Sequence, residues 1–156
     1  MSAKKFFIVK GKGISDTSPV NAFDRVLINT GLGNVNIIPV SSIISGEAVE
    51  TPQRSFETGS LVYTVLSKNT GVKGDKISAG LVWGRACKGD EKIGLVVTAQ
   101  QNFIDDKNLK KLLEDRIREM AVNRGMELTS FKAEVESLDI QTSKYGCVAV
   151  IFVYVI

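Results

Sequence analysis

Few residues of this chain could carry out chemistry, and histidine is not among them. The 156 residues include no histidine and two cysteines, Cys87 and Cys147, with no Cys-x-x-Cys pair. Without an imidazole, a Ser-His-Asp triad, a Cys–His pair and a histidine-ligated zinc are all excluded. Each cysteine stands alone in an apolar stretch, which is typical of a small core residue. Catalysis must therefore come from serine, threonine, carboxylate, lysine or arginine, or from a group made out of the chain itself.

The adjacent serines Ser41 and Ser42 are the first candidates, because they directly follow the apolar run 35–40. Two serines at a strand end usually close a turn or act as caps through side-chain hydrogen bonds, so the pair alone does not indicate a reactive site. Asn36 alone fits a side chain that closes a turn, and Asp24 alone fits an exposed helix position.

Two helices are expected to position these residues. Ser18 and Pro19 are typical of a helix start, apolar residues then recur at helical spacing, and Gly31 would end that helix. A longer amphipathic helix is predicted over about 106–124, with charges of both signs on its outer face.

Strands make up most of the remaining chain. They are expected at 6–9, 35–40, 60–67, 76–86, 92–100, 131–141 and 145–156, with a glycine-rich loop at 10–15. The segment 131–141 alternates and is expected to be half exposed, whereas 145–156 is nearly all apolar and is expected to be buried on both faces. Two long helices are too few for a doubly wound parallel sheet. The pattern predicts an α+β fold, a layered α/β/β/α sandwich of mostly antiparallel sheets.

Composition is that of an ordinary globular domain, with 44% hydrophobic and 24% charged residues. We expect one domain over residues 1–156, in the cytoplasm and without a membrane partner, since no apolar run reaches the roughly 18–20 residues that span a bilayer. The net charge is +3. The basic start of the chain motivates a nucleic-acid-binding alternative, which a salt-dependent binding assay would test; we expect no nucleic-acid partner. This start consists of Lys4, Lys5, Lys10 and Lys12.

The segment 21–42 carries a more specific pattern than any single motif. It contains Asn-Ala-Phe-Asp at 21–24, Gly-x-Gly-Asn-Val-Asn at 31–36 and Ser-Ser at 41–42. At these separations the motifs resemble the pyruvoyl-dependent arginine decarboxylases of archaea and some bacteria, and the similarity continues to the Tyr-Gly-Cys at 145–147. The resemblance implies the fold of the pyruvoyl-dependent histidine and arginine decarboxylases, with neither a metal nor pyridoxal phosphate.

By this resemblance the chain cuts itself between Ser41 and Ser42. The Ser42 hydroxyl would attack the Ser41 carbonyl, and β-elimination would leave a dehydroalanine at position 42 that hydrolyses to a covalent pyruvoyl group. Residues 1–41 would become the β chain and residues 42–156 the α chain. Asn36 matches the family asparagine that lies beside the scissile bond, where it could donate to the developing oxyanion.

The implied substrate is L-arginine, which would form a Schiff base with the pyruvoyl ketone and be converted to agmatine and carbon dioxide. Asp24 matches the family carboxylate that binds the guanidinium group. Val20 and Ile43, with Ile44, are candidates for apolar walls that favour loss of the carboxylate. The family forms homotrimers or dimers of trimers with sites shared between subunits, and we expect the same assembly here.

One position departs from the family pattern. The family has a glutamate in the strand after its Gly-Leu pair, where it acts as the general acid, and this chain has Thr98. A threonine hydroxyl is too weak an acid to replace it directly. Water or another side chain could supply the proton, the substrate could differ from arginine, or the protein could be a family homologue that processes itself without efficient catalysis.

Overall fold

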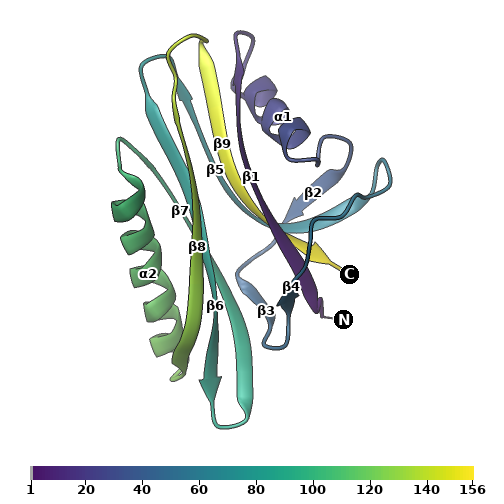
Figure 1. Ribbon diagram of the computed structural model, residues 1–156, viewed down its shortest axis with the longest axis vertical. Helices are drawn as coiled ribbons and strands as arrows, with labels where there is room; N and C mark the ends of the chain where they lie inside the picture. The colour runs from purple at the N-terminus through teal and green to yellow at the C-terminus, as the bar shows by residue number, and fades with distance from the viewer. Residues whose placement is uncertain (1) are drawn as a thin grey trace.

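The computed structural model describes residues 2–156, which form two sheets packed face to face with one helix on each outer face (Figure 1). The five-stranded sheet contains, in spatial order, β2 (Asn36–Pro39), β5 (Leu61–Val72), β9 (Tyr145–Val155), β1 (Lys5–Ser15) and β4 (Val49–Glu50). The four-stranded sheet contains β3 (Ile43–Ser45), β7 (Glu91–Asn102), β6 (Lys76–Lys88) and β8 (Glu127–Asp139). The long strands pair antiparallel, so the predicted α/β/β/α sandwich is confirmed.

The helices cover opposite sides of the sandwich. Helix α1 (Pro19–Asn29) packs against β1, β9 and β5, and helix α2 (Asp106–Asn123) packs against β6, β7 and β8. Ser18 caps α1 by accepting a hydrogen bond from Asn21 N, and Asp105 caps α2 in the same way. Neither helix in the described part of the chain is long and apolar enough to cross a membrane.

The predicted glycine-rich loop at 10–15 is wrong, because β1 continues without interruption to Ser15. Gly13 lies where α1 crosses this strand, and a Cβ atom there would come 2.6 Å from the carbonyl oxygen of Ala22. The glycine therefore serves close approach of helix and strand rather than a turn.

Strand β9 lies at the centre of the five-stranded sheet, between β5 and β1. Its residues from Gly146 to Val153 are all buried, so the prediction of a strand buried on both faces is confirmed. Cys147 and Val153 pack beneath α1, whereas Val150 and Phe152 pack between the two sheets.

The two shortest strands near the serine pair, β3 and β4, were not predicted. Strand β3 pairs antiparallel with β7, and β4 pairs parallel with β1. Since β2 belongs to one sheet and β3 to the other, the chain crosses between the sheets within residues 40–42.

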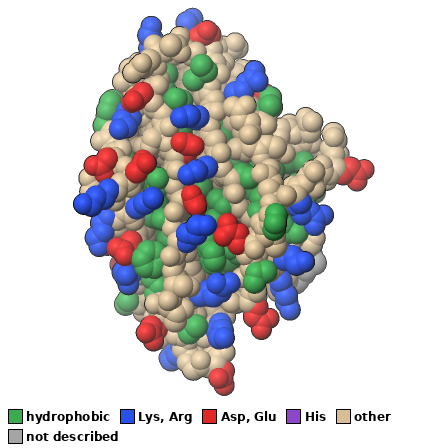
Figure 2. All heavy atoms as spheres, viewed as in Figure 1, with side chains coloured by type: hydrophobic (Ala, Val, Ile, Leu, Met, Phe, Trp, Pro, Cys, Tyr) green, Lys and Arg blue, Asp and Glu red, His purple; other side chains and the backbone are tan. Residues whose placement is uncertain are grey.

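Figure 2 shows Lys and Arg side chains interspersed with Asp and Glu over the face that carries α2 and β8. On α2, Glu114 pairs with both Lys111 and Arg118, at 3.3 and 3.2 Å. The predicted solvated helix face of mixed charge is therefore confirmed.

Candidate active site

The serine pair lies in the crossing between the two sheets. Val40 still belongs to the β2 side, since its N–H donates to the Thr64 carbonyl at 2.7 Å. Ile43 already belongs to β3 and stands opposite Leu95 of β7. Ser41 is exposed and Ser42 is half-buried. The bond between the serines is thus held at both ends by different sheets while remaining open to solvent at Ser41.

The backbone of Ser42 is fixed to the four-stranded sheet. The N–H of Val96 donates to the Ser42 carbonyl oxygen at 2.8 Å, which extends the β3–β7 ladder by one residue beyond Ile43. A hydrogen-bonded carbonyl accepts electron density more readily, and it also makes the neighbouring Cα proton more acidic. Both effects favour β-elimination at position 42.

Thr98 lies on the same strand as Val96, two residues farther along β7. Leu95 and Ala99 pack toward α2, while Val96 packs between the sheets. Because side chains alternate along a strand, Thr98 points into the space between the sheets, on the face shared with Val96. Its carbonyl oxygen accepts a hydrogen bond from Arg116 Nη1 of α2 at 2.6 Å. This contact attaches β7 to α2 at a point that the pairing with β3 does not reach.

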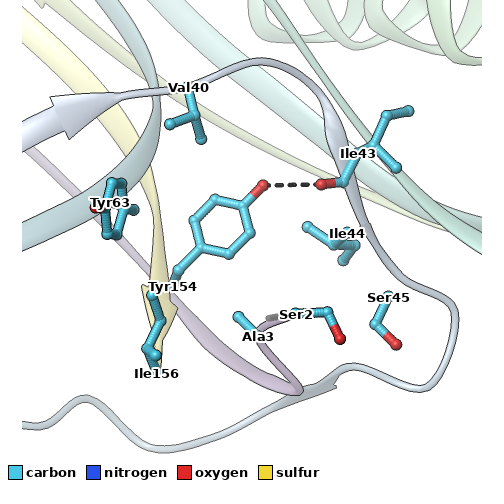
Figure 3. Close-up of a pocket in the computed structure, with 9 residues that line it drawn as sticks. All are labelled: Ser2, Ala3, Val40, Ile43, Ile44, Ser45, Tyr63, Tyr154 and Ile156. Carbon is cyan, nitrogen blue, oxygen red and sulfur yellow. Dashed lines mark hydrogen bonds between the residues drawn. The ribbon is translucent and has the colours of Figure 1, made fainter.

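An open hollow of about 590 Å³ borders the crossing (Figure 3). Val40 and Ile43, which flank the serine pair, line one side, and Tyr63 and Tyr154 line another. The side chains around the hollow are apolar or carry hydroxyl groups. Such a wall suits the loss of a carboxylate, because it disfavours the full charge of the starting carboxylate.

Tyr154 reaches the crossing from β9. Figure 3 shows its ring beneath the arch of chain from Val40 to Ile43, with the hydroxyl end directed at the arch. The hydroxyl donates to the Ile43 carbonyl oxygen at 3.2 Å. The ring is half-buried and makes an edge-to-face contact with Phe152, with ring centres 5.3 Å apart. Burial raises the pKa of the Tyr154 phenol, which keeps the hydroxyl protonated.

The other predicted site residues lie elsewhere in the subunit. Val20 and Asp24 are one turn apart on the exposed side of α1, a helix that packs on β1, β9 and β5 and not on β3 or β7. Asn36 begins β2, and its side-chain amide donates to the Gly59 carbonyl at 3.2 Å. Since a strand advances about 3.3 Å per residue, Asn36 lies about 13 Å from Val40.

All but one of the predicted residues therefore fall into two groups, which we call the crossing group and the helix group. The crossing group contains Ser41, Ser42, Ile43 and Thr98, and the helix group contains Val20 and Asp24; Asn36, on β2, belongs to neither group. In Figure 1, α1 lies beside the upper parts of β1 and β9, and β3 lies in the lower half of the molecule. One subunit does not bring the two groups together.

Sequence reasoning did not single out Tyr154 or Arg116. Tyr154 occurs in a continuous apolar run, where nothing separates it from its core neighbours, and Arg116 occurs among the mixed charges of α2. Their contacts with Ile43 and Thr98 depend on how distant segments pack, and no local sequence signal reports that packing.

Comparison with known proteins places the chain in a family. The family model described as pyruvoyl-dependent arginine decarboxylase matches residues 5–156. The chain belongs to the pyruvoyl-dependent arginine decarboxylase family. A protein named pyruvoyl-dependent arginine decarboxylase from Methanopyrus kandleri is 30% identical over 152 residues, which cover 97% of this chain and 96% of that protein.

Two further relatives have the same name. The Methanococcus aeolicus protein is 36% identical over 128 residues, covering 81% of this chain and 73% of the relative. The Methanocaldococcus jannaschii protein is 34% identical over 145 residues, covering 90% and 82%. The resemblance drawn from the motifs at 21–42 is confirmed by these matches.

The family depends on a pyruvoyl group, and the crossing fits one at position 42. This group supplies an electrophilic ketone that accepts the electron pair released when an amino acid loses its carboxylate. Ser42 would provide the atoms, Val96 N–H holds the adjoining carbonyl, and the apolar hollow beside it leaves room for a small molecule. Among residues 2–156, no group of three or more cysteine, aspartate or glutamate side chains is placed to hold a metal ion.

Proposed function

We propose that this chain is a self-processing arginine decarboxylase that cuts itself between Ser41 and Ser42 and converts L-arginine to agmatine and carbon dioxide. The observation that carries the proposal is the match of residues 5–156 to the family, together with the serine pair in an exposed crossing between two sheets. The products are a β chain of residues 1–41 and an α chain of residues 42–156.

The chain's own residues divide the work of self-cleavage. The Ser42 hydroxyl attacks the Ser41 carbonyl, so that an ester forms and the peptide C–N bond breaks. Loss of the Ser42 α-proton then breaks the Cβ–Oγ bond, which releases residues 1–41 as a carboxylate and leaves a dehydroalanine at position 42; the Val96 N–H stabilises the charge that develops on the Ser42 carbonyl. Water hydrolyses the imine tautomer of this residue, which releases its nitrogen as ammonia and leaves the ketone. Attachment of the crossing to two sheets holds the attacking and attacked groups together.

Arginine recognition requires a carboxylate, and Asp24 is our candidate for it. The walls of the hollow beside Ser42 include no acidic side chain, whereas Asp24 is exposed on α1 with Val20 one turn before it. A neighbouring subunit that placed its helix group against this crossing would bring Asp24 and Val20 to the substrate. We therefore propose a homotrimer, alone or as a pair of trimers, with each site shared by two subunits.

Exposed apolar side chains near both groups support this assembly. Val20 on α1 is 77% exposed, Ile43 at the crossing is 46% exposed, and Leu61 beside the start of β2 is 66% exposed. Large exposed apolar residues of this kind are commonly covered by subunit contact. We also infer a cytoplasmic location, since both cysteines are unpaired in the fold.

A second candidate function is supported by Thr98. Without a carboxylic acid at this position, the chain could process itself and act on a different amino acid, or serve as a non-catalytic family member. In the non-catalytic case no amino acid would be turned over, and Thr98→Glu would restore some activity.

Denaturing electrophoresis with intact mass, followed by incubation with carboxyl-labelled arginine, tests the proposal. We expect two fragments in place of one chain of 16.9 kDa, a keto group on the larger fragment, and release of labelled carbon dioxide. A single uncut chain would refute self-processing. Cleaved protein that releases no carbon dioxide from arginine across pH 4–8 would refute the substrate.

A further inference from the structure

Decarboxylation leaves an electron pair on the substrate carbon, and that carbon must receive a proton before the product can leave. The proposed function therefore needs a proton donor near position 42. Thr98 points into the space between the sheets, but an aliphatic hydroxyl is a very weak acid. Another side chain of the site, or water, must supply the proton.

Within the described residues, no side chain that lines the hollow is a carboxyl, ammonium or imidazole group. Their proton-bearing side chains are hydroxyls, and a phenol with an ordinary pKa of about 10 is far more acidic than an aliphatic alcohol. Tyr63 and Tyr154 are the two phenols that line the hollow.

Contact with the crossing distinguishes the two phenols. The Tyr154 hydroxyl is 3.2 Å from the Ile43 carbonyl oxygen, one peptide unit from Ser42, and its ring is fixed against Phe152. Tyr63 is exposed on β5. In Figure 3 the Tyr154 hydroxyl lies under the arch that contains the serine pair, whereas Tyr63 stands to one side.

We propose that Tyr154 is the catalytic proton donor of this chain, in the role that a glutamate at position 98 has in the family. The proposal rests on the proposed decarboxylase function. The O–H bond of Tyr154 breaks, the proton moves to the substrate carbon from which carbon dioxide has left, and water returns a proton to the phenolate. Until then the Ile43 carbonyl keeps the hydroxyl aimed at the crossing.

A phenol suits this step for a physical reason. Burial raises the pKa of Tyr154, so the hydroxyl remains protonated at neutral pH. The carbon that has lost carbon dioxide is a strong base, and a weak acid held in place can protonate it.

Tyr154→Phe tests the role, with Tyr145→Phe as the matched control at the other end of β9. Removing the phenol should leave self-cleavage complete and slow carbon dioxide release from arginine by about 100-fold or more, within the usual range for loss of a general acid. The control should keep both properties. Adding Thr98→Glu to Tyr154→Phe should raise turnover at least tenfold, since it returns an acid to the site.

The mass of the α-chain terminus gives a readout that does not depend on turnover rate. When the donor beside the substrate carbon is missing, a proton is added more often to the α-carbon of residue 42. Hydrolysis there leaves an amino group on that residue and releases the substrate portion as an aldehyde. We expect Tyr154→Phe to accumulate α chains that begin with alanine during incubation with arginine, and the control to retain the keto terminus.

The outcomes separate this inference from the function on which it rests. If the unmodified protein does not cut itself or does not decarboxylate arginine, the proposed function fails before any variant is compared. If the unmodified protein is active, three results overturn the role of Tyr154. These are Tyr154→Phe turnover within twofold of the control, failure of Tyr154→Phe to self-cleave, and a slow variant that neither forms alanine termini nor responds to Thr98→Glu.

Discussion

The crossing group and the helix group differ in how completely one subunit builds them. Ser42 is fixed through its own carbonyl to Val96 and through the next carbonyl to Tyr154, so one chain supplies both contacts beside the proposed cleavage point. Asp24 and Val20 project from an exposed helix face that no other part of residues 2–156 covers.

This difference separates two tasks. On the proposed function, the serine pair to be cut and the Val96 N–H lie together in one chain. Asp24, our candidate for binding the guanidinium group, lies on a helix that makes no contact with β3 or β7 of the same chain. Changes at the serine pair should therefore block processing, and changes at Asp24 or Val20 should lower turnover of arginine while processing continues.

The largest effect is expected from Ser42→Ala, which removes the attacking hydroxyl. This variant should remain a single chain of full length and release no carbon dioxide from arginine, because no ketone can form at position 42. Intact mass after extended incubation checks this result. Appearance of the two fragments in this variant would show that another residue starts the cut.

Asp24→Asn should come next, with processing intact and kcat/KM for arginine lower by roughly 30-fold, equivalent to about 2 kcal/mol for a charge-assisted hydrogen bond. Glu119→Gln, an exposed change on α2, is the control. Coexpressed Ser42→Ala and Asp24→Asn chains should regain activity in mixed oligomers, because some shared sites then contain both native residues. No recovery on mixing would contradict a shared site.

Gly13→Ala should disturb the helix group without touching the crossing. The added methyl group would lie 2.6 Å from the Ala22 carbonyl oxygen and 2.8 Å from Arg25 Cβ, so α1 must shift. We expect a loss of about 1–3 kcal/mol in stability, or about 3–10 °C in Tm, with self-cleavage retained. Lys12→Ala on the same strand is the control for calorimetry. An unchanged Tm in Gly13→Ala would show that the helix yields without cost.

The smallest effect is a difference in thiol reactivity. Burial raises the pKa of Cys147 to about 11, so the reactive thiolate is scarce near pH 8 and increases as the pH rises toward that value. Iodoacetamide at pH 8 should modify the half-buried Cys87 at least tenfold faster, as measured by peptide mass. Gly13 stands opposite Cys147 in the β1–β9 pair. Gly13→Ala should therefore reduce the difference between the modification rates of Cys87 and Cys147. Equal rates in the native protein would contradict the burial of Cys147.

Local patterns were sufficient to predict much of the architecture and insufficient for its junctions. The Ser18–Pro19 helix start and the apolar strand that begins near Tyr145 have local sequence patterns, and the folded structure keeps both elements as those patterns predict. Strand β3 has three residues, too few to display a period, and its pairing with β7 is a long-range contact. The glycines of β1 favoured the prediction of a loop, because the close approach of α1 that requires a glycine comes from another part of the chain.

The same distinction applies to the site. The serine pair, Asn36 and Asp24 were recognisable through the resemblance of the motifs at 21–42 to a known family, yet their separation within one subunit depends on which face of which sheet each element occupies. Tyr154 was hidden because the core needs an apolar residue at nearly every position of β9, and an aromatic ring meets that need equally well.

The position of β1 determines how the two proposed fragments would be joined in the fold. Residues 1–41 include β1, which pairs with β9 along its whole length, so the proposed cut would leave two polypeptides interleaved in one sheet. The uncut chain forms this sheet within one molecule, whereas the two cut polypeptides would have to meet to form it. Recovery from denaturation should therefore depend on concentration for this pairing in the cut protein, and not in the uncut chain.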